Sequence, residues 1–351
     1  MTRTVVGLDI GSSGVRAVEL RPGRRPAVRR SVSVDLPAGV VKAGVLADPE
    51  ALTEALRDLW AQGRFGSRAV ALGLANDSVL VRQMDLEWMA PADFRKALRY
   101  QVADALPVPV DEANLDYHLL DELETEESET EEARKLARIM LVAAGREMVD
   151  GYVHAVEAAG LRAVRADLAP FALVRAAAAS QPTSESDVVV DIGADMITVV
   201  LVRDGAPRSV RMISGFGGET ITHALQERYD WAWEDAERSK RVLGIAPEDG
   251  DDAQTAHPAR ALVAEQARVL VGEIRTTLEF FAGPSGGERP FSRLLLTGRG
   301  SLLRGLDALL ADELGVEVTP LAPFGGRRAR DLDTEHWAAY AVATGLCLGV
   351  K

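Results

Sequence analysis

Val6-Gly-Leu-Asp-Ile-Gly-Ser-Ser-Gly14 and Val189-Val-Asp-Ile-Gly-Ala-Asp-Met196 are two copies of one pattern, which decides the fold of this 351-residue chain. Each copy is an apolar run that ends in Asp-Ile-Gly and continues into a second alternating stretch, residues 15–20 or 197–202. Two such runs around a glycine-containing turn predict a β-hairpin. The sequence therefore predicts two related hairpins, one near the start of the chain and one past its middle.

The turns of both predicted hairpins offer groups that suit phosphate and magnesium. Glycine lets a backbone approach a phosphate closely, and successive turn N–H groups form an anion-binding hollow. The candidate residues are Gly11, Ser12 and Ser13 in the first turn and Gly193 and Ala194 in the second. The carboxylates of Asp9 and Asp191 would hold a hydrated Mg²⁺ rather than contact phosphate. One such turn is weak evidence, but two copies indicate two related domains that face a nucleotide between them.

This arrangement resembles the actin/Hsp70/sugar-kinase superfamily, and two further segments match the resemblance. The apolar run 294–297 enters a Gly298-Arg299-Gly300 turn before a helix, like the adenosine motif, whose backbone lies against base and ribose. Glu237 and Lys240 are three residues apart on a predicted helix and therefore share a face. In related proteins such a pair flanks adenine and ribose, but a solvated helical ion pair explains the spacing equally well.

Two more residues are assigned roles by the same resemblance. Asp167 ends a predicted strand before the connecting helix, where superfamily members place the residue that positions the attacking water. A helix N-cap is an equally good explanation of this aspartate. Arg16 stands where actin-like members often have a phosphate-contacting lysine, and its planar guanidinium keeps the charge and adds bidentate donors.

Composition and charge limit the classes of function. The chain is 47% hydrophobic and 26% charged, which is typical of a globular protein with room for two cores. The net charge is −13, and the tract 121–132, with eight acidic residues and no basic one, supplies −8 of it. We therefore expect no nucleic-acid binding, and we predict that the tract is a solvated loop or hairpin tip.

Targeting and redox signals are few. Cys347 is the single cysteine, which excludes a disulfide framework and suits a reducing cytosol. The chain enters a predicted strand at once, without a signal peptide. Its longest uncharged apolar stretch, residues 337–350, is too short to span a bilayer, so we expect membrane contact only through a partner.

Together with the pattern of elements, the resemblance implies an α/β, actin/Hsp70-like two-domain fold made of duplicated RNase H-like domains with a small inserted α+β subdomain. Strands are expected at residues 5–10, 15–20, 28–36, 69–74, 79–84, 115–120, 137–144, 161–166, 188–202 (a hairpin), 209–213, 293–297 and 316–319. The strands at 69–74 and 79–84 are expected to pair with each other. Helices are expected at residues 49–62, 91–105, 147–159, 218–229, 231–243, 259–282, 302–313 and 335–348. The first domain would comprise residues 1–85, with 167–187 and 331–351 returning to it. The inserted subdomain would comprise residues 86–166, and the second domain 188–330, with a helical subdomain at about 217–285.

At this level of detail the chain resembles the PilM family of type IV pilus assembly proteins, which are actin-like and related to FtsA. The segments that carry the resemblance are residues 6–20, 100–120, 141–152, the second hairpin and residues 217–221. The resemblance implies that ATP and Mg²⁺ bind between the two halves. It also implies that the inserted subdomain, of the 1C or SHS2-like type, binds the cytoplasmic N-terminal tail of PilN. The protein would then be cytoplasmic, peripherally associated with the inner-membrane platform of the pilus, with no span of its own and with a homo-oligomer left open.

Two other functions compete with this interpretation. A small-molecule kinase of the same superfamily would need a base beside an acceptor hydroxyl, and the chain shows no additional Asp motif of that kind. An FtsA-like division protein would favour an amphipathic membrane-targeting tail, and none is seen at Gly349-Val-Lys351. The leading interpretation is an ATP-binding assembly protein with slow hydrolysis at most.

Overall fold

The computed structural model describes residues 5–21, 26–125, 134–180, 186–246, 258–282, 291–322 and 334–349.

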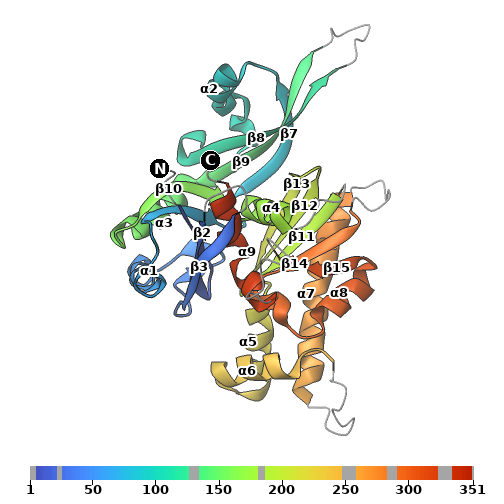
Figure 1. Ribbon diagram of the computed structural model, residues 1–351. Helices are drawn as coiled ribbons and strands as arrows, with labels where there is room; N and C mark the ends of the chain where they lie inside the picture. Colours follow the sequence, from blue (N-terminus) through green and yellow to red (C-terminus); the bar gives the residue numbers. More distant parts are fainter. Residues whose placement is uncertain are drawn as a thin grey trace.

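Two five-stranded sheets with matching strand order form the centre of the molecule (Figure 1). The first sheet has the order β10-β6-β1-β2-β3, and the second has the corresponding order β15-β14-β11-β12-β13. The strands of the first sheet are β1 (Val6–Ile10), β2 (Gly14–Arg21), β3 (Ala27–Asp35), β6 (Ala69–Leu74) and β10 (Arg162–Leu168). Those of the second are β11 (Ser186–Ile192), β12 (Met196–Arg203), β13 (Ala206–Ser214), β14 (Arg293–Thr297) and β15 (Glu317–Pro320). The hairpins β1–β2 and β11–β12 occupy equivalent places, so the predicted duplication is confirmed.

Helices α1 (Pro49–Gly63) and α3 (Arg146–Ala158) lie side by side on the outer side of the first sheet. The predicted start of α1 is correct: the Asp48 carboxylate accepts the Ala51 N–H at 3.0 Å, and Pro49 stands in the first turn. Apolar residues of α1, Leu52 and Leu56 among them, are fully buried in one cluster with β1. This burial is what holds α1 on the sheet.

Helices α4 (Ala169–Ser180) and α9 (Thr334–Leu348) lie between the two sheets (Figure 1). They pack against each other, and α9 also contacts β1 and β2. Two glycines allow this close approach: a Cβ on Gly7 would lie 1.9 Å from Ala343 O, and one on Gly345 would lie 1.9 Å from Ala172 O. The layer of α4 and α9 therefore fixes the distance between the two sheets.

The remaining helices of the second half are α5 (Gly218–Tyr229), α6 (Trp233–Leu243), α7 (Pro258–Ala282) and α8 (Leu306–Leu314). Together with β11 and β14 they form a second core cluster. The predicted helix at 302–313 begins later, because residues 299–302 form a 3-10 turn after Gly298. Two short strands, β4 (Val41–Lys42) and β5 (Val45–Leu46), form a small hairpin before α1.

A three-stranded sheet with one covering helix extends away from the two main sheets (Figure 1). Its order is β7-β9-β8, and the elements are β7 (Leu80–Glu87), β8 (Ala113–Glu124), β9 (Lys135–Gly145) and α2 (Pro91–Gln101). Phe94, Leu98 and Val102 pack on Ile139 and Leu141. This stripe is therefore core rather than a groove. We call β7, α2, β8 and β9 the inserted sheet unit.

The structure corrects several expected pairings and boundaries. Residues 69–74 and 79–84 were expected to pair, but β6 lies between β1 and β10 while β7 pairs with β9. The reason is burial: β6 is buried throughout, as a central strand must be, whereas β7 alternates. Residues 146–166, expected in the inserted subdomain, form α3 and most of β10, which pack on the first sheet. The helix expected to reach residue 105 ends at Gln101.

The inserted sheet unit also contacts the second sheet. Arg208 on β13 pairs with Asp121 on β8 at 2.8 Å, and β7 lies against β13. Residues 126–132 of the acidic tract and the loops at 247–257 and 283–290 lie outside the described residues. Among the described helices, none is long and apolar enough to cross a membrane.

Candidate functional site

The two Asp-Ile-Gly turns close in the same way at the ends of β1 and β11. The Gly11 N–H donates to Gly14 O at 3.0 Å, and the Gly193 N–H donates to Met196 O at 2.8 Å. A Cβ on Gly193 would lie 2.9 Å from Met196 O, so the second turn requires glycine for this closure. In both turns, therefore, the backbone next to the aspartate is tightly closed.

Asp9 and Asp191 lie on the faces of the two sheets that look inward, toward α4 and α9. Alternation along β1 places Asp9 on the face of Gly7, which contacts α9. Alternation along β11 places Asp191 on the face of Val189, which packs in the cluster with α4 and α9. Alternation within each strand, together with packing of both sheets on α4 and α9, therefore turns the two carboxylates toward the same side.

The electrostatics of the pair reflect this closeness. Burial, and then the negative charge of Asp9, raise the pKa of Asp191 to about 7, although Arg16 counteracts this. Burial also raises the pKa of Asp9, against the opposing effect of Arg16, whose Nη1 lies 3.7 Å from Asp9 Oδ2. Two neighbouring carboxylates with one guanidinium near them suit a cation that would offset their charge.

Arg16 links the first turn to this pair. It is the register partner of Asp9 and is buried, with its Nη2 3.4 Å from Ser13 Oγ. A Cβ on Gly11 would lie 3.2 Å from Arg16 Nη1. The structure thus brings Arg16, Gly11 and Ser13, with Ser12 in the same turn, beside Asp9.

The Gly298-Arg299-Gly300 turn lies directly against the second Asp-Ile-Gly turn. Gly298 has a φ of +87°, and a Cβ there would lie 2.3 Å from Asp191 Oδ1 and 2.2 Å from Ile192 O. A Cβ on Gly300 would lie 3.0 Å from Gly193 O. Only glycine fits at these two positions, so the turn can lie flat against the site.

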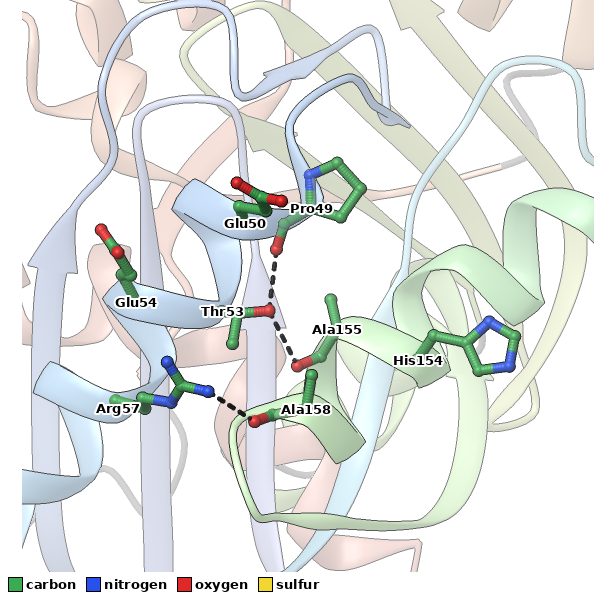
Figure 2. Close-up of a pocket in the computed structure, with 8 residues that line it drawn as sticks. All are labelled: Pro49, Glu50, Thr53, Glu54, Arg57, His154, Ala155 and Ala158. Atoms are coloured by element: carbon green, nitrogen blue, oxygen red, sulfur yellow. Dashed lines mark hydrogen bonds between the residues drawn. The ribbon is translucent and has the colours of Figure 1, made fainter.

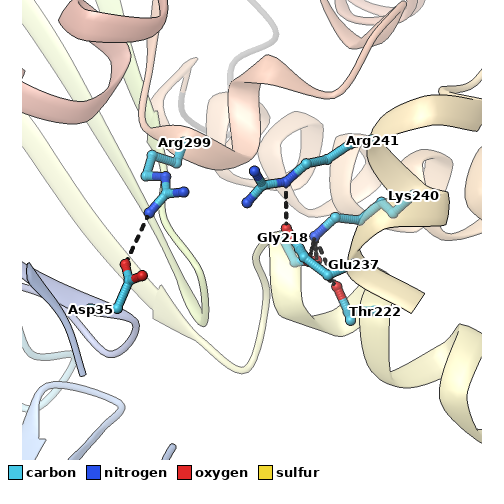
Figure 3. A network of polar contacts seen from close by, with 7 residues as sticks. All are labelled: Asp35, Gly218, Thr222, Glu237, Lys240, Arg241 and Arg299. Atoms are coloured by element: carbon cyan, nitrogen blue, oxygen red, sulfur yellow. Dashed lines mark hydrogen bonds and ion pairs between the residues drawn. The ribbon is translucent and has the colours of Figure 1, made fainter. Parts of the chain in front are cut away.

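Arg299 reaches from this turn toward the first sheet (Figure 3). Its Nη1 lies 3.8 Å from the exposed carboxylate of Asp35, at the end of β3. Desolvation, and then the nearby charges of Arg16 and Arg241, lower the pKa of Arg299. Three guanidinium groups from β2, α6 and this turn therefore share one region, and together they would attract an anion.

Glu237 and Lys240 form a mostly buried network on α5 and α6 rather than a solvated pair (Figure 3). Lys240 Nζ donates to Gly218 O and Thr222 Oγ1, both at 2.8 Å, and lies 2.5 Å from Glu237 Oε2. Burial lowers the pKa of Lys240, although Glu237 opposes this. Burial raises the pKa of Glu237, but Lys240, Thr222 and Arg241 together lower it by more, so this pKa ends below its usual value. All three N–H groups of Lys240 thus have acceptors.

This network positions the N-terminus of α5 beside the second turn. The Gly218 N–H donates to Gly193 O at 3.0 Å, and the Glu219 N–H donates to Ala194 O at 2.8 Å. Sequence reasoning missed Thr222, Arg241 and Asp35 as members of the site. The Gly217-Gly218 pair was the local signal that could have pointed to close packing here.

Asp167 lies near the carboxyl end of β10, level with Asp9 near the end of β1, but in a different environment. Its Oδ2 accepts hydrogen bonds from Arg165 and from Arg175, the latter at 2.6 Å. The same two arginines donate to carbonyl oxygens at the end of α9, Gly349 O and Gly345 O. Asp167 therefore holds two arginines that fasten α9, and its proposed role with water stays a prediction.

A hollow lies between α1 and α3, away from the two Asp-Ile-Gly turns (Figure 2). It measures about 440 Å³ and is lined by Pro49, Glu50, Thr53, Glu54, Arg57, His154, Ala155 and Ala158. Thr53 Oγ1 on α1 donates to Ala155 O on α3 at 3.3 Å, and Arg57 Nη2 donates to Ala158 O at 2.9 Å. These bonds tie the two helices together beneath an open surface.

Comparisons with known proteins agree with this architecture. The model of the family described as type IV pilus assembly protein PilM matches residues 7–351. The chain is similar to a solved "PilM-PilN type IV pilus biogenesis complex", with 30% identity, a TM-score of 0.80, and coverage of 98% of this chain and 97% of that one. It shares its fold with ethanolamine utilization protein EutJ from Carboxydothermus hydrogenoformans, at 16% identity and a TM-score of 0.57 over 99% and 90% of the chains. It also shares its fold with MreB5 of Spiroplasma citri bound to ADP, at 12% identity and a TM-score of 0.54 over 98% and 95%. The predicted actin-like fold is confirmed.

Proposed function

Since the chain belongs to the PilM family of type IV pilus assembly proteins, we propose that it binds ATP with Mg²⁺ and, through its inserted sheet unit, a PilN-like tail. The family match favours this function over a small-molecule kinase or an FtsA-like division protein. One observation carries the nucleotide half of the proposal: Asp9 and Asp191, in two equivalent turns, lie close enough for the charge of Asp9 to raise the pKa of Asp191.

The residues of the site fit a hydrated Mg²⁺ and a polyphosphate. Mg²⁺ in nucleotide sites is held by one or two carboxylates, with water and phosphate oxygens completing its shell. Asp9 and Asp191 would hold it, and Mg²⁺ would neutralise phosphate charge. Arg16 and the N–H groups of the two turns would bind phosphate oxygens. The turn at Gly298–Gly300 would lie against the base and ribose, and Glu237 and Lys240 would hold the α5 N-terminus in place.

The partner half of the proposal rests on the family and on the outer edge of the inserted sheet unit. The solved relative with 30% identity is described as a PilM-PilN complex. In this chain β8 is an outer strand of the three-stranded sheet, and such an edge can accept an extended peptide as an additional strand. Acidic residues along β8, including Asp116 and Glu122, would favour a tail with basic residues.

Strand β13 offers a path between the two proposed sites. At one end Arg208 pairs with Asp121 of β8, and just past the other end the Gly215 N–H donates to Asp195 O in the second turn at 2.8 Å. A nucleotide that shifts the second turn would therefore also shift β13 against the inserted sheet unit. This link supports a protein whose nucleotide state adjusts its affinity for the partner, with slow hydrolysis at most, held at the inner face of the membrane by that partner.

We expect labelled N-terminal tail peptides of PilN-like proteins to bind the full chain, and added salt to weaken binding. Salt acts because it screens attraction between basic tail residues and the acidic edge. Fluorescence anisotropy at several salt concentrations, with and without Mg²⁺–ATP, measures both effects. If no such tail binds in either nucleotide state, the partner half of the proposal is wrong.

Neutralising five glutamates of the tract (Glu126, Glu127, Glu129, Glu131 and Glu132, each to Gln) should reduce this salt sensitivity. Glu50→Gln with Glu54→Gln is the control, because it removes negative charge elsewhere, at the hollow between α1 and α3 (Figure 2). Equal salt dependence in all three proteins would show that the tract does not border the tail.

Asp167→Asn separates the catalytic hypothesis from the structural contacts. If Asp167 positions the attacking water, the variant should lose about tenfold or more of any ATP turnover, while ATP affinity stays within about tenfold. If Asp167 only holds Arg165 and Arg175, the melting temperature falls and turnover per folded molecule stays the same. Turnover, affinity and melting temperature are therefore measured on the same preparation.

A further inference from the structure

The hydroxyl of Thr297 is a buried polar group for which the described residues provide no hydrogen-bond partner. Thr297 ends β14 and is only 1% exposed. An unsatisfied buried hydroxyl costs free energy, since its hydrogen bonds to water are lost on folding and not replaced. Such a group in a native structure points to a hydrogen-bond partner, such as an ordered water or an ion with its water, that the chain alone does not supply.

The register of the second sheet places this hydroxyl beside Asp191. Thr297 on β14 is the Cα partner of Asp191 on β11, in a parallel pair. Partners in a parallel pair present their side chains on the same face of the sheet. The next residue, Gly298, has its Cα so close to Asp191 that a Cβ there would lie 2.3 Å from Oδ1. The free hydroxyl and the carboxylate therefore border the same space.

We propose that Thr297 is a positioning residue for the metal, whose hydroxyl holds a water of the Mg²⁺ shell next to Asp191. This inference rests on the proposed nucleotide function. Groups that orient a metal's ligands are commonly as important as the carboxylates themselves. Thr297 would thus act on the metal through water rather than on the nucleotide.

Thr297→Val tests this assignment because valine has nearly the same shape and lacks the hydroxyl. Without ligand, the variant should melt at the same or a higher temperature than the wild type, because an unsatisfied polar group is removed. Calorimetry with ADP in EDTA should give an unchanged affinity. The gain in ADP affinity on adding Mg²⁺ should fall about tenfold, and Thr297→Ser should restore it.

Thr277→Val is the matched control, since the buried Thr277 hydroxyl has a partner, Glu273 O at 3.0 Å in α7. It should leave the effect of Mg²⁺ unchanged. A Thr297→Val protein that melts lower or fails to fold would show that the hydroxyl is structural and overturn the inference. An unchanged Mg²⁺ effect in Thr297→Val would also overturn it. Wild-type protein that binds no ADP under either condition would instead overturn the nucleotide function itself.

Discussion

Asp191→Asn is expected to lower the affinity for Mg²⁺–ATP by about tenfold or more while stabilising the unliganded protein above pH 7. The carboxylate pKa is raised to about 7 in the folded protein, by burial and then by Asp9, from about 3.9 in the unfolded chain. Between these values the folded state binds more protons than the unfolded state, so stability falls as pH rises from about 4 to about 7. The amide carries no such charge, so the variant lacks this loss. Its stability advantage at pH 8 should be on the order of 1 kcal/mol or more.

The same titration predicts the pH dependence of binding in the wild type. A cation needs the deprotonated carboxylate, so Mg²⁺–ATP affinity should rise with pH toward 7, while metal-free ATP changes less. Asp9→Asn should also weaken Mg²⁺–ATP more than metal-free ATP. Melting curves across this pH range test the predicted change in stability. Calorimetry with Mg²⁺ or with EDTA tests the predicted change in nucleotide affinity.

Asp187→Asn is the control on the same strand. Asp187 is buried, whereas Asp191 is half-buried, and Asp187 is paired with Arg293, whose Nη2 lies 3.0 Å from Asp187 Oδ2. Removing this charge should destabilise the protein and leave the effect of Mg²⁺ intact. If Asp191→Asn behaves like Asp187→Asn in both respects, Asp191 is a structural residue and the magnesium site is wrong.

Gly298→Ala is expected to abolish nucleotide binding and to destabilise the fold by about 2–5 kcal/mol. Two effects add: the φ of +87° disfavours any L residue, and the new Cβ would lie 2.2 Å from Ile192 O and 2.3 Å from Asp191 Oδ1. The backbone must move away from the second turn to make room. That movement separates the Gly298–Gly300 turn from the second Asp-Ile-Gly turn.

Gly205→Ala isolates the backbone effect. Gly205 has a φ of +73°, but a Cβ there meets nothing within 4 Å. This variant should lose only about 1 kcal/mol and bind nucleotide normally. Urea unfolding and ADP calorimetry on both variants give the comparison. Equal losses in the two proteins would mean that the contact of Gly298 with Asp191 is unimportant.

The sequence by itself determined the duplicated hairpins and most helices, and it predicted the central residues of the candidate site. Alternating apolar runs, Asp-Ile-Gly turns and caps such as Asp48 are local signals, because each depends on residues a few positions apart. Two copies of one local signal were enough to predict that Asp9 and Asp191 belong to one site. The Gly298–Gly300 turn was likewise recognisable from a strand that runs into glycines.

Only the tertiary structure decided which strands pair and which polar groups meet. The sequence could not show that β7 joins β9 rather than β6, or that β10 completes the first sheet, because strand pairing depends on segments far apart in the chain. It left Glu237 and Lys240 between a solvated ion pair and a pair that flanks a nucleotide. The burial that excludes water comes from α5. The arginines that hold Asp167 and the register that sets Thr297 beside Asp191 are also long-range. A hydrogen bond or a charge interaction depends on distances in space, and packing of the two sheets around α4 and α9 sets those distances.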